Sequence, residues 1–566
     1  MIDVFKREIA EVLGHLLNKP SSEIIKSLEK PKILDHGHLA FPVFALAKEK
    51  RQAPPAIAID LAKQLTGKIL NVSQISALSG FLNFKISPEA MQAEVFREMK
   101  APDRLGCTDE GKGQRVVIDF SSPNIAKPMH VGHLRPTVIG QAIKNLAQSQ
   151  GYDVIAVNHI GDWGSQFGKL AWAMQNWGSG YDFSVDPIKK LVELYVRFHA
   201  EAAKNPDLEK KGAETFLKLE QGDPEIQKLW KKVIEYSFKD YERLYALLGT
   251  KHDVILGESF YNDKLQDVVN RLEKKSLLKE SEGAQVVFFE EAESMPPCII
   301  KKSDGASIYA TRDLAAAIYR KEVQKADQLI YVVGHDQSLH FKQVFKVLQM
   351  LGYDWAESCH HISFGFYQFK DGKMSTREGR VILLEDVISK SIEMVTQMIS
   401  QKNPDLENKD QVAKEVGVGA LIFHDLLNDR LKNVEFDWER VLSLDGDSGP
   451  YVQYTNVRCQ SLIRKYGSPV SLDDLKLMDS LEEQRLMFTI LQFQDVVSAS
   501  YKNFKPNILA QYMLELSGNF SSFYNKCRIL GEDPAVEKSR MALVKATELT
   551  LIRGMQLMNM PIPKAM

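Results

Sequence analysis

The sequence has few cysteines, and it lacks both a long hydrophobic run and an excess of charge of either sign. Its five cysteines are scattered, odd in number and never spaced as CxxC, so we expect neither a disulfide framework nor a structural metal. No apolar run approaches the ~20 residues that cross a bilayer, and the N-terminus shows no cleavable signal pattern. These absences exclude secreted disulfide-rich and membrane-spanning classes. They favour a cytoplasmic protein without a membrane partner.

Charge is close to balanced. Seventy-two Lys and Arg stand against 74 Asp and Glu, for a formal net charge of -2. Bulk electrostatics therefore neither requires nor excludes a nucleic-acid partner, and any phosphate-binding face must be local. The 44% hydrophobic and 26% charged fractions are ordinary for a globular protein, and 566 residues predict three or four domains.

The chain divides into four predicted segments. Residues 1–100 combine helical periodicity with an alternating strand at 81–86, which indicates a small α+β domain, and the Gly- and charge-rich residues 101–114 indicate a linker. From 115 to 385 we predict a Rossmann-like, doubly wound parallel sheet, because helical segments separate the apolar runs at 116–120, 154–158, 254–256 and 329–333.

An insertion within the third segment and the whole of the fourth segment are predicted to be helical. The Lys- and Glu-rich stretch at about 186–248 is expected to be a helical insertion within the α/β domain, with its charges on a solvated face. Strand signals fade towards the end of the chain, so residues 386–566 are expected to form an all-α domain.

The stretch VVIDFSSPNIAKPMHVGHLRPTV, residues 116–138, is the most informative part of the chain. A β-branched strand enters a turn, and a helical pattern follows, so that His130 and His133 lie where the strand hands over to the helix. Gly132 lets a ligand approach the backbone, and the first helical turn offers unpaired N–H groups. The pattern indicates a phosphate site. Two surface histidines at a helix cap remain the alternative for HxxH alone.

A second motif, KMSTR at residues 373–377, lies between Gly372 and Gly379, which suit a flexible loop. HVGH, preceded by SPN and followed by LR, resembles the HIGH signature of class I aminoacyl-tRNA synthetases in its arginyl-tRNA synthetase form. KMSTR resembles the KMSKS signature of the same class, and GDWGSQFG at 161–168 also matches the arginyl family. The resemblance extends over nearly the whole chain.

The resemblance implies an arginine-tRNA ligase. Arginine and ATP, the latter with Mg²⁺, would give arginyl-adenylate and pyrophosphate, and the arginyl group would pass to the 3′-terminal adenosine of tRNA(Arg). It also implies an N-terminal domain that contacts the tRNA elbow, a helical anticodon-binding domain, and a protein expected to act as a monomer.

The resemblance assigns the ATP site to both motifs. His130, Gly132 and His133 would bind the phosphates, while Lys373, Met374, Ser375 and Arg377 would close over the pyrophosphate. Thr376 replaces the second lysine of KMSKS, and the lysine of SPNIAK, Lys127, is the candidate that substitutes for it. A solvated loop lysine is the alternative. We expect catalysis to depend on His130, His133, Lys127, Lys373 and Arg377.

Recognition of arginine requires two carboxylates that accept the fork of guanidinium N–H donors. Glu258 in GESFYND and Asp313 in SIYATRDLAAA resemble the acceptors of the family, and Tyr309 would form a wall. Asn124 would hold the backbone amine or carboxylate, and Gln337 would line the pocket. Five other residues stay open. His335 and His340 could touch ATP or be core or loop histidines, and Asp162, Trp163 and Gln166 could be pocket architecture or tRNA-end contacts.

The segment DSGPYVQYTNVR resembles the anticodon-binding helix of the family. Tyr451 and Tyr454 would stack on bases and Arg458 would meet a phosphate or base edge, with core aromatics as the alternative. Asn456 stands where the family often has His. Two rival functions remain: a non-catalytic RNA-binding paralogue, and a synthetase for another amino acid. The paired carboxylates disfavour a synthetase for an apolar amino acid.

Overall fold

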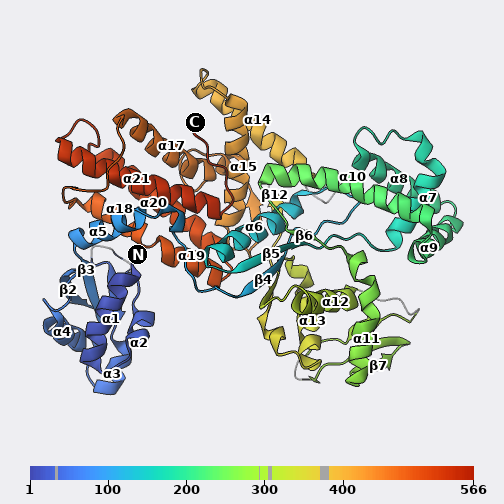
Figure 1. Cartoon of the computed structure of the whole chain (residues 1–566), viewed down its shortest axis with the longest axis horizontal. Coiled ribbons are helices and arrows are strands. Elements are labelled where there is room, and N and C mark those ends of the chain that lie inside the picture. Colours follow the sequence, from blue (N-terminus) through green and yellow to red (C-terminus); the bar gives the residue numbers. More distant parts are fainter. Residues whose placement is uncertain (32, 34–35, 292–293, 304–308, 370–381) are drawn as a thin grey trace.

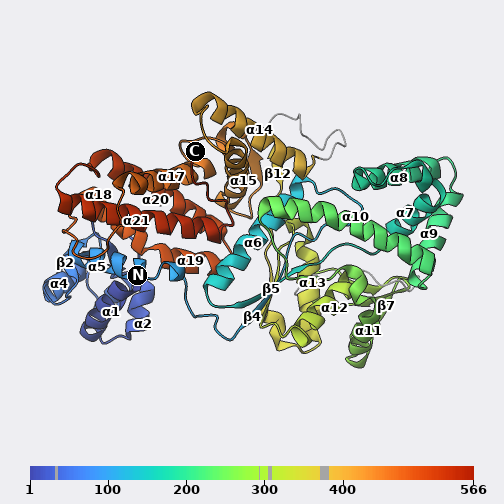
Figure 2. The same cartoon turned by 45° about the horizontal axis from the view of Figure 1, so that its top comes forward.

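The computed structural model describes the whole chain except residues 32, 34–35, 292–293, 304–308 and 370–381. The molecule is elongated, with an N-terminal unit at one end and a helical insertion at the other (Figure 1). A parallel sheet lies between them, and a bundle of C-terminal helices packs beside both the sheet and the N-terminal unit, an arrangement that Figure 2 shows from a second direction.

The N-terminal unit is a three-stranded antiparallel sheet in the order β1-β3-β2, packed with helices. Its elements are α1 (Asp3–Leu17), α2 (Ser21–Ser27), β1 (Leu39–Pro42), α3 (Phe44–Lys50), α4 (Pro54–Leu65), β2 (Val72–Leu78) and β3 (Phe81–Ile86). Helix α5 (Pro88–Met99) and the short helix η2 (Pro102–Arg104) lead to the sheet domain. The expected strand at 81–86 is confirmed as β3.

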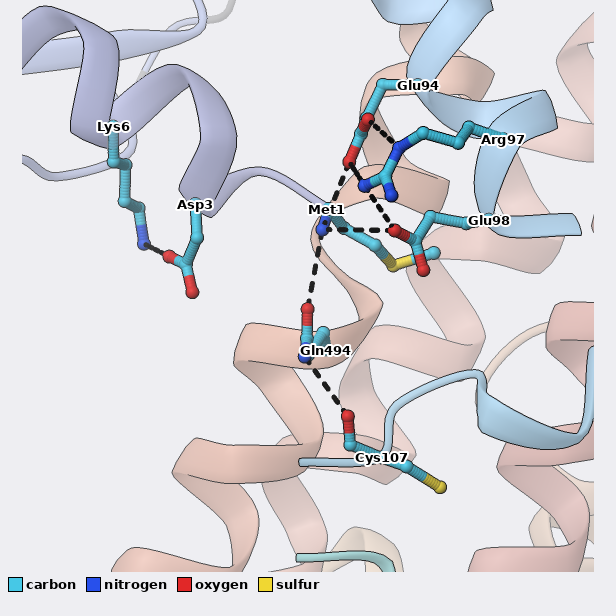
Figure 3. Close-up of polar contacts among 8 residues, drawn as sticks. All are labelled: Met1, Asp3, Lys6, Glu94, Arg97, Glu98, Cys107 and Gln494. Atoms are coloured by element: carbon cyan, nitrogen blue, oxygen red, sulfur yellow. Dashed lines mark hydrogen bonds and ion pairs between the residues drawn. The ribbon is translucent and has the colours of Figure 1, made fainter. Parts of the chain in front are cut away.

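The amino group of Met1 joins α5 to the C-terminal helices. It lies 3.2 Å from Oε1 of Glu94 and 3.8 Å from Oε1 of Glu98, and it donates to Oε1 of Gln494 at 3.4 Å. Gln494 also donates through Nε2 to the backbone oxygen of Cys107, at 3.1 Å (Figure 3). The N-terminal unit is thus tied to the C-terminal helices by polar contacts in addition to apolar packing.

The central sheet contains five parallel strands in the order β11-β10-β4-β5-β6. They are β4 (Arg115–Asp119), β5 (Asp153–Asn158), β6 (Val254–Ile255), β10 (Gln328–Tyr331) and β11 (Cys359–His361). Val116 and Ile118 belong to the core on one face and Val117 to the core on the other. Burial on both faces explains the continuous apolar runs, which predicted four of these strands.

Helices cover both faces of this sheet. They include α6 (Leu134–Ser149), α11 (Leu265–Lys274), α12 (Tyr309–Glu322) and α13 (Ser338–Met350). Between the helices lie the short helices η5 (Glu258–Lys264), η7 (His335–Gln337) and η8 (Asp354–Ser358), and an antiparallel sheet of β7 (Leu278–Ser281), β8 (Ala284–Val287) and β9 (Cys298–Lys301).

The insertion consists of helices, as the charge-rich periodicity predicted. They are α7 (Ser165–Trp177), η4 (Gly178–Gly180), α8 (Pro187–Ala202), α9 (Asp207–Glu220) and α10 (Pro224–Leu248). Helix α10 runs from the outer end of the insertion back to the sheet (Figure 1). Helix α7 belongs to the same group although it lies before residue 186, because α9 packs against it.

The C-terminal part is mainly helical. Its helices are α14 (Leu384–Lys402), α15 (Lys409–Leu427), α16 (Trp438–Val441), α17 (Gly449–Tyr466), α18 (Leu481–Leu491), α19 (Phe493–Lys502), α20 (Pro506–Lys526) and α21 (Pro534–Leu557). One short strand, β13 (Val434–Phe436), lies among them and pairs in parallel with β12 (Tyr367–Phe369). Within the described ranges, no helix combines the length and the apolar character that crossing a membrane requires.

His38 makes the stability of the N-terminal unit depend on pH. Its Nδ1 accepts a hydrogen bond from the backbone N–H of Ile86 at 3.0 Å, and its ring lies 4.6 Å from that of Phe488 in α18. Burial lowers the pKa of His38 to about 4, and the charge of Lys85 makes a smaller contribution in the same direction. Between pH 6.5 and 4 the unfolded chain therefore binds a proton that the folded chain does not.

We predict that the free energy of unfolding falls as the pH drops through this window, with about 3 kcal/mol lost to His38 once its site is fully protonated. Urea unfolding at a series of pH values measures this, with His38→Gln as the comparison because its amide does not titrate. Equal pH dependence of the two proteins would contradict the assignment.

Candidate active site

A cavity of about 680 Å³ lies at the carboxyl ends of the parallel strands. This is the edge at which open α/β sheets bind ligands. The cavity brings together eight of the predicted site residues from four separate stretches of sequence: Asn124, His130, Gly132, His133, Glu258, Tyr309, Asp313 and Gln337.

The two motif histidines bracket the short helix η3 (Val131–His133), which lies immediately before α6: His130 is its N-cap and His133 its last residue. The backbone N–H of Gly132 donates to Nδ1 of His130, and that of His130 donates to Nδ1 of His133, each at 3.1 Å. Since Nδ1 of each neutral ring is an acceptor, Nε2 must carry the hydrogen. The ring centroids are 4.0 Å apart.

Both imidazoles are kept neutral. Burial lowers the pKa of His133 to about 3, with a smaller contribution from His130. Burial and then the charge of Lys127 lower the pKa of His130. Near neutral pH the pair therefore offers two Nε2–H donors rather than two positive charges.

Close approaches explain two glycines of the site. A Cβ on Gly132 would lie 2.7 Å from the ring of His130, and one on Gly161 would lie 1.9 Å from Oδ1 of Asn124. Helix α10 supports the same loop, because the hydroxyl of Tyr241 donates to the backbone oxygens of Asn124 and Lys127 at 2.7 and 2.9 Å. The insertion thus helps to shape the cavity.

Glu258 is half-buried, and one of its carboxyl oxygens is an unused acceptor. Its Oε2 is buried and has no hydrogen-bond partner among the described residues. Burial raises its pKa to about 7; Asp313 and Asp162 also raise it, whereas Arg312 opposes the rise. A buried acceptor of this kind is costly unless a ligand satisfies it.

Asp162 of GDWGSQFG is part of the pocket architecture. Its carboxylate accepts from the backbone N–H of Ser259 at 2.8 Å and from the Ser259 hydroxyl at 2.6 Å. A Cβ on Gly257 would lie 2.4 Å from Oδ2 of Asp162. Asp162 therefore holds the turn that carries Glu258. Trp163 packs against Trp230, with ring centroids 5.8 Å apart.

Helix α12 carries the second carboxylate. It begins at Tyr309, so Tyr309 and Asp313 lie one turn apart, as the spacing predicted. Tyr309 is 65% exposed and stands at the rim of the cavity. His340 of α13 lies with its Nε2 2.5 Å from Oδ2 of Asp313.

Lys127 and His335 lie off the cavity lining, and other predicted residues fall outside the described residues. Lys127 is exposed and is absent from the cavity lining, although its charge acts on His130. Lys373, Met374, Ser375, Thr376 and Arg377 fall outside the described residues, as do Gly372 and Gly379. His335 also lies off the lining and contacts the ring of Phe366, with centroids 4.7 Å apart.

Sequence reasoning missed some lining residues and left others open. Asp119 ends strand β4, so the carboxyl-end rule was a signal for it, and Arg312 lies within the quoted SIYATRDLAAA motif. The lining residues without a predicted role also include His159, Asp336, Phe364 and Phe366. His340, for which the sequence allowed either an ATP contact or a core or loop position, also lines the cavity.

A second cavity of about 500 Å³ lies in the helical part and contains Tyr454, Arg458 and Met566. The guanidinium of Arg458 lies between two aromatic rings, 4.8 Å from the centroids of both Tyr454 and Tyr524, and it donates to the Tyr454 hydroxyl at 3.0 Å. Tyr451 is absent from the lining, and its hydroxyl lies 3.2 Å from that of Ser521.

Comparison with known families matches three parts of the chain. Residues 98–438 match the catalytic domain of class I (R) tRNA synthetases, residues 452–566 match the DALR anticodon-binding domain, and residues 3–86 match the arginyl-tRNA synthetase N-terminal domain. The catalytic match extends beyond 385 and includes strand β13.

Relatives and solved structures agree with this assignment. Arginine–tRNA ligases of Exiguobacterium sibiricum and Clostridioides difficile are 45% and 44% identical, over 99% of this chain and all of theirs. The arginyl-tRNA synthetase of Thermus thermophilus has the same fold, with a TM-score of 0.84 at 24% identity over the whole of both chains. That of Plasmodium falciparum has a TM-score of 0.80 at 26% identity, covering 95% of this chain and 94% of its own. The chain therefore belongs to the arginyl-tRNA synthetase family.

Proposed function

We propose that the 680 Å³ cavity is where this chain carries out the reaction of its family. In that reaction arginine and ATP give arginyl-adenylate and pyrophosphate, and the arginyl group then passes to the 3′-terminal adenosine of tRNA(Arg). The observation that carries the proposal is the placement of Glu258 and Asp313 in the same cavity as the neutral His130–His133 pair.

The carboxylates suit a guanidinium. Glu258 has a buried oxygen without a partner among the described residues, and Asp313 lies close enough to raise its pKa. A planar cation with several N–H donors satisfies both acceptors and relieves their repulsion. A lysine ammonium is a compact point charge and matches this pair less well. Tyr309, Gln337 and Asn124 are assigned to the remaining contacts with the amino acid.

The histidines suit the phosphates. When the arginine carboxylate attacks the α-phosphate, negative charge grows on the phosphoryl oxygens and pyrophosphate leaves. Two preorganised Nε2–H donors stabilise that charge without a proton leaving either ring. ATP enters as its Mg²⁺ complex, and Lys127 with Lys373 and Arg377 of KMSTR supplies positive charge to the phosphates; these assignments rest on the motifs.

The second cavity supports a role in binding tRNA. Arg458 and Tyr454 both line it, with the guanidinium over the tyrosine ring, and guanidinium groups bind phosphates and stack on splayed bases. Tyr451 is assigned the same role from the motif. A monomeric state and a cytoplasmic location stay predictions, as does contact of the N-terminal unit with the tRNA elbow.

A non-catalytic RNA-binding paralogue is the rival that the cavity argues against. Such a protein has no need for a buried, unpartnered carboxyl next to a second carboxylate, because these groups destabilise the empty protein. This loss of stability has a functional reason if a cationic substrate binds between the two carboxylates.

The first prediction is arginine-dependent exchange of pyrophosphate into ATP in the presence of tRNA(Arg). Lysine at the same concentration should give no exchange above background, because its ammonium leaves an acceptor unpaired. The assay is run with and without tRNA. Absence of exchange with arginine, or equal exchange with lysine, would remove the assignment.

The second prediction concerns Asp313. Asp313→Asn keeps the shape but removes the charge, so the KM for arginine should rise about 10- to 100-fold while the KM for ATP changes less than about twofold. Glu322→Gln is the matched control, since it neutralises an exposed carboxylate at the far end of the same helix. A selective loss of ATP affinity in Asp313→Asn would contradict the pocket assignment.

The third prediction concerns pH. Because the pKa of Glu258 in the empty cavity is about 7, a proton competes with the guanidinium below that value. The KM for arginine at saturating ATP should therefore rise about tenfold between pH 8 and pH 6. Glu258→Gln should show a high KM that no longer varies with pH over this range. A wild-type KM that is flat with pH would show that Glu258 does not meet the substrate.

A further inference from the structure

The contact between His340 and Asp313 joins two helices across the arginine side of the cavity. Nε2 of His340, on α13, lies 2.5 Å from Oδ2 of Asp313, on α12. The two side chains are 24% and 20% exposed, and both residues line the cavity. The two atoms are within hydrogen-bond distance, and hydrogen bonds to a charged acceptor are shorter and stronger than those between neutral groups.

The contact leaves one oxygen of Asp313 available. Among the described residues Oδ2 is paired with His340, and no described side chain or backbone group hydrogen-bonds to Oδ1. The terminal torsion of an aspartate is broad, so an unrestrained carboxylate rotates between several orientations. A donor that holds Oδ2 fixes this torsion and therefore fixes the direction of Oδ1.

The ring of His340 is itself held in place. It packs edge-on against Phe341, with centroids 5.3 Å apart, and Phe341 is 4% exposed and stacks on His361 at 4.7 Å. This support suits a side chain whose task is to orient another group. His340 differs in this respect from His335, the other histidine of the segment, because His335 lies off the cavity lining.

We propose that His340 is a positioning residue for guanidinium recognition: it donates from Nε2 to Oδ2 of Asp313 and so leaves Oδ1 aimed to accept from the substrate together with Glu258. The proposal rests on the function proposed above. It assigns the arginine selectivity of the cavity to three residues, of which His340 acts only through Asp313.

The test is a double-mutant cycle with His340→Ala and Asp313→Asn, using the arginine-dependent exchange assay with tRNA. His340→Ala should raise the KM for arginine about tenfold and leave the KM for ATP within about twofold. The double variant should be no worse than Asp313→Asn alone, because the histidine has nothing left to position. Lys342→Ala, an exposed position on the same helix, is the control.

A conservative variant separates positioning from general damage. The amide nitrogen of His340→Gln can donate to Oδ2 from a similar place, so this variant should recover most of the arginine affinity that His340→Ala loses. It also keeps the test open if His340→Ala does not fold, which thermal unfolding of each variant reveals.

The outcomes distinguish the two levels of the proposal. If the wild type shows no arginine-dependent exchange, the proposed function fails. If the wild type and Asp313→Asn behave as predicted but His340→Ala leaves the KM for arginine unchanged, or the two substitutions are additive, His340 does not act through Asp313 and only this inference is overturned.

Discussion

The buried ion pair between Asp119 and Arg320 is the contact on which the geometry of the cavity depends. Nη2 of Arg320 lies 2.7 Å from Oδ2 of Asp119, with side chains 1% and 7% exposed. Asp119 ends β4 and Arg320 belongs to α12, so the pair fixes the helix of Asp313 relative to the strand that leads to the histidine loop. Burial opposes the charge on Asp119, but Arg320 keeps the pKa of that carboxyl below its usual value. The pair also orients the loop, because the hydroxyl of Ser122 donates to Oδ1 of Asp119 at 2.8 Å.

A second buried pair links the histidine motif to the C-terminal helices. Arg135, one residue into α6, donates from Nε to Oδ1 of Asp425 in α15 at 3.0 Å, and from Nη1 to the backbone oxygens of Gly365 and Lys432 at 2.7 and 3.0 Å. The hydroxyl of Tyr367 in β12 donates to the same carboxylate at 2.9 Å. The carboxylate of Asp425 in α15 therefore holds together α6, which follows HVGH, and β12, which precedes residues 370–381. Loss of either charge at such a site costs about 3–5 kcal/mol, because the remaining charge stays buried.

Much of the fold was predictable because it depends on local patterns. The strands β4, β5, β6 and β10 are β-branched or apolar runs buried on both faces, and their periodicity is visible without the fold. Strand β11 escaped prediction because two of its three residues are His360 and His361, and its extended form comes from pairing with β10. Strand β13 escaped for the same reason, since three residues become a strand only beside β12.

The sequence by itself determined which chemical groups are present and on which local element each stands. Two histidines lie between a strand and a helix, the carboxylate of Glu258 follows β6, and that of Asp313 lies one turn after the start of α12. Only the tertiary structure decided how these groups meet. It pairs His340 with Asp313, sets Asp162 under the turn of Glu258 and leaves Lys127 outside the cavity lining. The physical reason is that such contacts join residues far apart in the chain. Their distances depend on how helices and strands pack, which no local periodicity encodes.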